Sequence, residues 1–289
     1  LLILIKEWFM RYLLLFLLIF STYSFANNFR IGVLPYTNSI EIIKLYELLS
    51  TFLAKELNQP IDVYTSKDYK AFYDDSQNNL FDIIITGPHL GTLHLAHNFK
   101  PLYRYNTVLK PIFVVSKDSN FNNISDLKNT KIALSGKLSV SSMAGIKVLK
   151  NLGFKNDQDY KIIEAKSHTS AIKSVLLKEV DAAITTYTPL KQLLDDETKE
   201  KIRIIESDYE MPHLFILANP NTSNENAQKL KVILKKFEQT EEGKAFFAKT
   251  GYNGFIEISQ KDKNDMESLI EDTKKQFLTG KYKNTLWIN

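Results

Sequence analysis

Residues 132–145, Ile-Ala-Leu-Ser-Gly-Lys-Leu-Ser-Val-Ser-Ser-Met-Ala-Gly, carry the pattern that decides the fold. An apolar run is followed by a short turn that contains Gly and then by a Ser-rich helical pattern. The start of a helix has unpaired N–H groups and the positive end of the helix dipole, which favour negative charge. The hydroxyls of Ser139, Ser141 and Ser142 can donate further hydrogen bonds there. The stretch therefore predicts a strand, a turn and an anion-binding helix start.

Ordinary helix capping is the alternative interpretation of these serines. Ser is a preferred N-cap residue, and one of the three would fill that role with no ligand present. A cap needs one hydroxyl, whereas three serines stand within residues 139–142. We therefore interpret the cluster as part of a ligand site, together with Val140, which stands between its members.

The same alternation of strand and helix patterns runs through the chain from residue 29 and is typical of an α/β protein. Short β-branched runs predict strands at residues 29–34, 61–64, 81–85, 112–115, 131–134, 160–163, 182–185, 202–205 and 214–217. Helical patterns predict helices at residues 39–57, 141–152, 170–178, 226–239, 242–249 and 261–279. This order favours parallel or mixed sheets flanked by helices.

Two Pro-containing segments indicate where the chain passes between two lobes. Lys110-Pro111 precedes the predicted strand at residue 112, and Met211-Pro212-His213 precedes the predicted strand at residue 214. We expect lobe 1 to contain residues 27–110 and 215–289, and lobe 2 to contain residues 111–214. The two connecting strands would form the hinge, and a ligand would lie in the cleft between the lobes.

The N-terminal segment differs from the remainder, and residues 1–26 are predicted to be a signal peptide. Arg11 precedes an apolar run at residues 12–20, and Ser24-Phe25-Ala26 supplies small residues for signal peptidase. The apolar run is shorter than the roughly 20 residues of a spanning helix, and an uncleaved membrane anchor is the alternative. The chain contains no Cys, which suits an exported protein without disulfides. We expect a periplasmic location.

Composition and motif content narrow the function. The 289 residues, 44% of them hydrophobic, suffice for one large core or two modest ones. The net charge of +4 comes from 37 Lys and Arg scattered among 33 Asp and Glu, which does not support nucleic-acid binding. The spacing of His89, His94 and His97 lacks the His-Glu-x-x-His arrangement of a metal site, and no nucleophile is paired with a base. We expect a monomer without enzymatic activity, cofactor or metal.

Four further loops at the ends of predicted strands supply candidate ligand-binding residues. Ligands of open α/β sheets sit outside the carboxyl ends of the strands. The candidates are Tyr36 after the first strand, Thr86 and Gly87 before Pro88, His168 at a helix start, and Thr186 with Tyr187 after the strand at residues 182–185. A plain strand-to-helix turn is the alternative for Thr86 and Gly87, and a surface or capping role is the alternative for His168.

These residues, in this order, resemble the phosphonate-binding family of periplasmic solute-binding proteins of ABC transporters, which have the type II periplasmic binding fold. The resemblance covers most of the mature chain. It implies that Ser139, Ser141 and His168 hold phosphoryl oxygens and that Tyr36 and Thr86 line the other lobe. The motifs that carry it are Gly32-Val-Leu-Pro35, Thr86-Gly-Pro88, Ile124-Ser-Asp-Leu-Lys128, the Ser-rich helix start, Ser167-His168 and Glu179-Val-Asp-Ala-Ala183.

The resemblance also bears on the ligand and the partner. Family members that hold an aminoalkyl phosphonate place an acidic residue near the end of the strand after Val-Asp-Ala-Ala, where this chain has Thr186. We therefore expect a small anionic solute without an amine, such as phosphate, phosphite or a small alkyl phosphonate, which is delivered to an ABC transporter permease. The alternative is the ligand-sensing domain of a membrane signalling receptor that is held by an uncleaved N-terminal helix.

Overall fold

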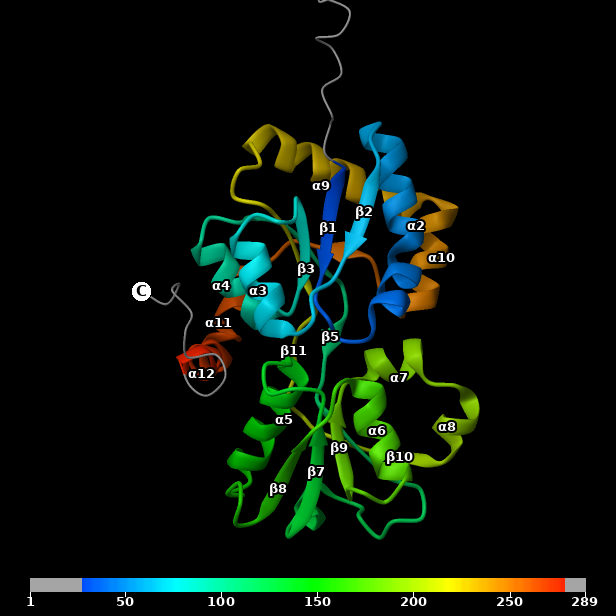
Figure 1. Ribbon diagram of the computed structural model, residues 1–289, viewed down its shortest axis with the longest axis vertical. Helices are drawn as coiled ribbons and strands as arrows, with labels where there is room; N and C mark the ends of the chain where they lie inside the picture. The colour runs from blue at the N-terminus through cyan, green and yellow to red at the C-terminus, as the bar shows by residue number, and fades with distance from the viewer. Residues whose placement is uncertain (1–27, 279–289) are drawn as a thin grey trace, which may run out of the picture.

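The computed structural model describes residues 28–278 and contains two lobes, each built on its own sheet (Figure 1). The first lobe has a six-stranded sheet in the order β13-β4-β12-β3-β1-β2. Strands β1, β2 and β3 are parallel, whereas β12 is antiparallel to β3 and β4. The strands are β1 Phe29–Val33, β2 Ile61–Tyr64, β3 Ile83–Thr86, β4 Lys100–Tyr105, β12 Phe215–Ala218 and β13 Phe255–Ile256.

The second lobe has a five-stranded sheet in the order β10-β6-β9-β7-β8. Strand β7 is parallel to β8 and β9, whereas β6 is antiparallel to β9 and β10. Both sheets are therefore mixed, which confirms the predicted α/β class with two lobes. The strands are β6 Ile112–Ser116, β7 Thr130–Leu134, β8 Tyr160–Glu164, β9 Ala182–Thr185 and β10 Ile202–Glu206.

Helices cover the sheets and bury their apolar side chains. In the second lobe, Ile112 and Val114 pack in a cluster on one face of the sheet and Phe113 and Val115 in a cluster on the other, as the period of two of a strand requires. The helices are α2 Ser39–Leu57, α3 Tyr69–Gln77, α4 Pro88–Ala96, α5 Val140–Asn151, α6 His168–Leu176, α7 Tyr187–Leu193, α8 Asp196–Glu200, α9 Asn224–Gln239, α10 Glu241–Thr250, α11 Gln260–Asn264 and α12 Glu267–Leu278, with a 3-10 turn at Ile124–Leu127.

Two short strands connect the lobes. Strand β5, Val108–Leu109, pairs antiparallel with β11, Met211–Pro212, and both lie between the two larger sheets (Figure 1). Helix α12 packs against α4 of the first lobe and α5 of the second. Its residue Leu269 shares an apolar cluster with Met143 of α5 and with Met211 of β11. The connections predicted between the lobes are present, and the expected hinge corresponds to β5 and β11, which contribute Leu109 and Met211 to this cluster.

The structure also corrects several predicted boundaries. The helix predicted at residues 170–178 begins at His168, because Ser167 Oγ accepts a hydrogen bond from the Ser170 N–H and caps the helix. The helix predicted at residues 261–279 is two helices, α11 and α12. Strands β4, β5, β11 and β13 and the short helices α3, α7 and α8 were not predicted.

The predicted signal peptide at residues 1–26 lies outside the described residues. Within residues 28–278, no helix has the length and apolar character that crossing a membrane requires.

Candidate functional site

The Ser-rich start of α5 follows the carboxyl end of β7 through the turn at residues 135–139. Ser139 occupies the N-cap position, yet its side chain makes no capping hydrogen bond. Its Oγ lies 2.8 Å from Ser141 Oγ, and both residues are only 2% exposed. Capping therefore does not explain this hydroxyl pair, and the first N–H groups of α5 keep their capacity to donate.

Close packing sets the position of α5 over its sheet. A Cβ atom at Gly145 would lie 2.4 Å from Cγ2 of Ile184 on β9, so this helix turn approaches the strand as only Gly permits. The Ser pair is thereby held near the carboxyl end of β9, where Thr185 and Thr186 stand.

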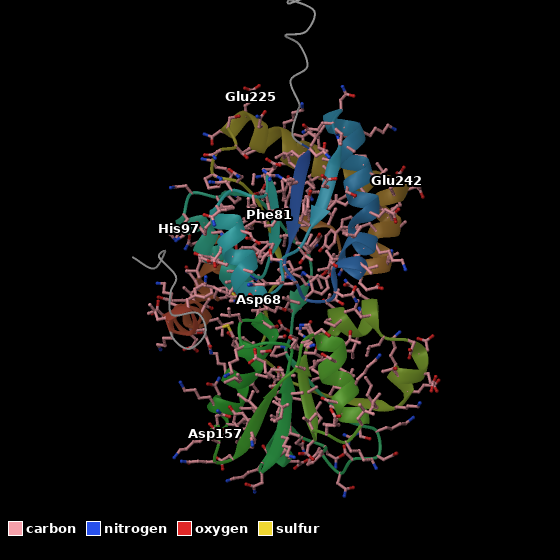
Figure 2. All side chains as sticks on the ribbon, viewed as in Figure 1. Asp68, Phe81, His97, Asp157, Glu225 and Glu242 are labelled. Atoms are coloured by element: carbon pink, nitrogen blue, oxygen red, sulfur yellow. The ribbon has the colours of Figure 1, made fainter. Side chains whose placement is uncertain are left out.

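A small cavity of about 40 Å³ lies at this helix start and is lined from both lobes and from the hinge. Asp68, which caps α3 and precedes the lining residue Tyr69, lies at the edge of the first lobe that faces the second (Figure 2). Among the described lining residues there is no Asp, Glu, Lys or Arg, so the cavity presents neutral donors and acceptors. The lining residues are Leu34, Tyr36, Tyr69, Leu109, Ser139, Val140, Ser141, His168, Thr186, Thr188, Pro189, His213, Leu214 and Tyr252.

His168 is the first residue of α6 and contributes a fixed, neutral imidazole to the cavity. Its Nε2 lies 3.1 Å from Ser135 Oγ, and its Nδ1 lies 2.9 Å from Thr185 Oγ1. Burial lowers its pKa to about 4, so the ring is uncharged at neutral pH. Both ring nitrogens already have hydroxyl partners, and direct donation to a ligand requires exchange of one of them.

The structure brings six of the ten predicted site residues to the cavity and places the other four elsewhere. Thr86 ends β3 and Ser142 lies in the first turn of α5; both are buried, and neither hydroxyl has a partner among the described residues. Gly87 is the N-cap of α4, without a side-chain cap. Tyr187 lies away from the cavity, and its hydroxyl donates a hydrogen bond to Glu206 Oε1. The six that line the cavity are Tyr36, Ser139, Val140, Ser141, His168 and Thr186.

Four polar lining residues were not predicted: Tyr69, Thr188, His213 and Tyr252. The Tyr69 hydroxyl interacts with the hydroxyls of Ser139 and Ser135, while burial raises its pKa to about 12. Tyr69 follows β2, so the rule that ligands sit after strands could have found it. His213 stands in the crossover segment, where no strand-to-helix loop pointed to it.

Hydrogen bonds between protein groups hold the lobes together around the cavity. Gln192 of α7 accepts a hydrogen bond from the Tyr36 hydroxyl at 3.2 Å, and its Nε2 donates to the Thr250 carbonyl at 2.8 Å. His89 of α4 donates through Nε2 to the Leu138 carbonyl at 3.0 Å. These three contacts join elements of the six-stranded lobe to elements of the five-stranded lobe.

A wider cavity of about 810 Å³ lies between the start of α2 and the start of α6. Its lining includes Pro35 and Ser167, the sequence neighbours of Tyr36 and His168, so it adjoins the small cavity. Three lysines, Lys67, Lys166 and Lys173, line it together with one acidic residue, Glu41. The excess of positive charge favours the approach of anions.

Two mixed α/β lobes joined by two short strands, with a small cavity between them, define the class of two-lobed periplasmic binding proteins. A family model described as "ABC transporter, phosphonate, periplasmic substrate-binding protein" matches residues 31–263, and the chain belongs to this family. It is thus the substrate-binding component of a transporter and not an enzyme, and it works with ABC transporter components.

Solved structures of other binding proteins share the fold. PhnD1 from Prochlorococcus marinus in complex with methylphosphonate is similar at a TM-score of 0.77 and 18% identity, over 86% of this chain and 98% of that one. A binding protein component of an ABC phosphonate transporter from Pseudomonas aeruginosa gives a TM-score of 0.69 at 13% identity, over 86% and 97%. The aliphatic sulphonate binding protein SsuA from Escherichia coli gives 0.62 at 15% identity, over 88% and 94%. No curated protein matches the sequence.

Proposed function

We propose that this protein captures a small phosphorus oxyanion without an amine, such as methylphosphonate, phosphite or phosphate, in the cavity between its lobes. The observation that carries the proposal is the start of α5, where Ser139 and Ser141 are buried, paired with each other and not used for capping. Hydroxyl and backbone donors that converge on one buried point suit an oxyanion, which accepts hydrogen bonds through several oxygens.

The charge of the cavity supports a ligand without an amine. An ammonium group taken from water into a buried site needs an anionic partner, or the desolvation cost is left uncompensated. No carboxylate is among the described lining residues, and Thr186 stands where the resemblance implies an acidic residue in family members that hold an aminoalkyl phosphonate. The cavity volume of about 40 Å³ also favours a compact ligand.

In this proposal, binding and closure are one event. The anion docks on the start of α5 when the lobes are apart, and closure about β5 and β11 brings Tyr36, Tyr69 and Tyr252 of the first lobe over it. The lobe boundaries then fall near residues 110 and 214, beside those hinge strands. Donors from both lobes replace the hydration shell of the anion, and the permease recognises the closed form.

A thermal-shift screen of the exported protein tests the proposal, with phosphate, phosphite, methylphosphonate, aminoethylphosphonate and sulfate as probes. A ligand at about a hundred times its dissociation constant adds about 2.7 kcal/mol to the free energy of unfolding. We expect phosphite or methylphosphonate to raise the melting temperature and aminoethylphosphonate to have a smaller effect. A larger shift with aminoethylphosphonate, or no shift with any phosphorus oxyanion, would contradict the proposal.

A further inference from the structure

His213 is a second imidazole in the cavity, and its environment differs from that of His168. It lies between β11 and β12, where the chain returns to the first lobe, and it is fully buried. Its Nε2 lies 3.2 Å from Thr188 Oγ1. Its Nδ1 is buried and has no hydrogen-bond partner among the described residues. A buried polar atom in a ligand cavity without a protein partner points to a ligand atom that pairs with it.

The groups around His213 keep its ring neutral. The ring of Tyr105 meets it edge-on at 5.6 Å between centroids, and the ring of Tyr252 meets it at 4.6 Å. Burial, together with a smaller contribution from the positive charge of Arg104 on β4, lowers the pKa of His213 to about 3. A neutral imidazole has one N–H donor and one acceptor nitrogen. If Nε2–H donates to Thr188 Oγ1, Nδ1 is the acceptor.

The other polar groups of the cavity do not favour a doubly charged ligand. Lys and Arg are absent from the described lining, and the remaining polar side chains are hydroxyls and the already paired His168. A second negative charge in such a site lacks a counter-charge and carries a desolvation cost. A singly charged phosphonate or phosphite instead carries one P–OH group, which needs an acceptor rather than a donor.

We propose that His213 Nδ1 accepts a hydrogen bond from the P–OH group of a bound phosphonate or phosphite, so that the cavity selects the monoanion over the dianion. This inference rests on the proposed function and adds to it the protonation state of the ligand and the residue that selects it. His213 is in this view a specificity-determining residue whose Nε2–H donates a hydrogen bond to Thr188 Oγ1.

Calorimetric titration of the wild-type protein with methylphosphonate tests the selection directly. The titration is run below and above the second pKa of methylphosphonate, in two buffers with different enthalpies of ionisation. We expect uptake of about one proton per bound ligand above that pKa, and an apparent affinity that falls about tenfold for each further pH unit. Binding without proton uptake, or an affinity that rises through this pH range, would overturn the inference.

A matched pair of substitutions tests the role of the residue. The amide of His213→Asn lies near the position of Nδ1, whereas the amide of His213→Gln lies near that of Nε2. We expect His213→Asn to retain methylphosphonate affinity to within about threefold and to keep the proton uptake, and His213→Gln to lose about tenfold or more. Equal losses in both variants, or no loss in either, would contradict the assignment.

His97→Gln is the control variant, because His97 lies on the outer side of the first lobe, away from the second (Figure 2). Its affinity and proton uptake should equal those of the wild type. The two levels of failure are distinguishable. If the wild type binds neither methylphosphonate nor phosphite at any pH, both the proposed function and this inference are wrong. If the wild type binds without proton uptake, only the inference fails.

Discussion

At the scale of single residues, the proposed function depends on hydroxyls that do not cap a helix. Ser167 shows the ordinary case, since its side chain caps α6. Ser139 has the same position on α5 and does not cap, because its hydroxyl is paired with that of Ser141. The capping hydrogen bond at the start of α6 marks Ser167 as a structural serine, and its absence at the start of α5 marks Ser139 as a candidate ligand-binding serine.

We expect Ser141→Ala to weaken methylphosphonate binding by about 1–3 kcal/mol, because a hydroxyl that donates to a buried anion is lost. Calorimetric titration measures this change. Ser174→Ala serves as the control, because the Ser174 hydroxyl donates to the Ala171 carbonyl within α6 and does not line the cavity. Unchanged affinity in Ser141→Ala would remove Ser141 from the site.

The sequence predicts candidate loops better than it predicts side-chain directions. Thr186, Tyr187 and Thr188 are consecutive, and a pattern that places a ligand after β9 cannot separate them. Successive residues at a helix start point in directions about 100° apart. Thr186 precedes α7 and has an extended backbone, so the helical step does not apply to it; Thr186 and Thr188 line the cavity, while Tyr187 reaches Glu206 outside it. His213 was not predicted because the strand that it follows, β11, has only two residues and leads into another strand and not into a helix.

At the scale of elements, the position of α5 depends on the close approach of Gly145 to Ile184. We expect Gly145→Ala to lower the free energy of unfolding, measured by urea denaturation. The new Cβ would overlap a fully buried side chain, and overpacking costs about 1–3 kcal/mol. Over most of its range this cost exceeds the gain of about 1 kcal/mol that Ala has over Gly in a helix.

Lys150→Ala is the control, because Lys150 is exposed on the same helix and its replacement should change stability by less than about 0.5 kcal/mol. A Gly145→Ala protein that is more stable than the wild type would show that Ile184 yields without strain.

Elements with a long periodic pattern could be predicted, and short ones could not. Every strand of at least four residues except β4 was found, and β4 begins with Lys100-Pro101, a poor strand signal. Strands β5, β11 and β13 have two residues each, too few to show a period. The break between α11 and α12 has no Pro or Gly to mark it. These short elements are held by tertiary pairing, which a local pattern does not contain.

At the scale of the whole molecule, four buried histidines link stability to pH. The pKa values of His89 and His168 are lowered to about 4, and those of His94 and His213 to about 3, in each case mainly by burial. In the unfolded chain these groups bind protons as the pH falls through about 6.5, whereas the folded protein does not. The unfolded state therefore binds more protons in this range, and stability falls as the pH falls.

Above about pH 7, we expect these histidines to cause no change in the free energy of unfolding with pH. Between about pH 6.5 and 4, we expect the free energy of unfolding to decrease as the pH falls, by roughly 1 kcal/mol per pH unit for each histidine. Urea denaturation at several pH values measures the slope. His94→Gln should remove the contribution of about one proton from the slope of the free energy of unfolding against pH, since His94 lies in the core of the first lobe, stacked on Tyr73. An identical slope in this variant would show that His94 is protonated in the folded protein.

The contacts of Gln192 and His89 across the lobes have a consequence for transport. Both residues join the lobes through bonds made between protein atoms alone. In the proposed closure, part of the free energy is therefore independent of the solute, and a fraction of the vacant molecules would be closed at any moment. Such molecules contain no solute, yet they present the same closed surface as molecules that have bound it. A transporter that recognised only the closed shape would complete cycles without moving solute, in proportion to the number of these molecules. The rate of such unproductive cycles would therefore rise when the solute is scarce.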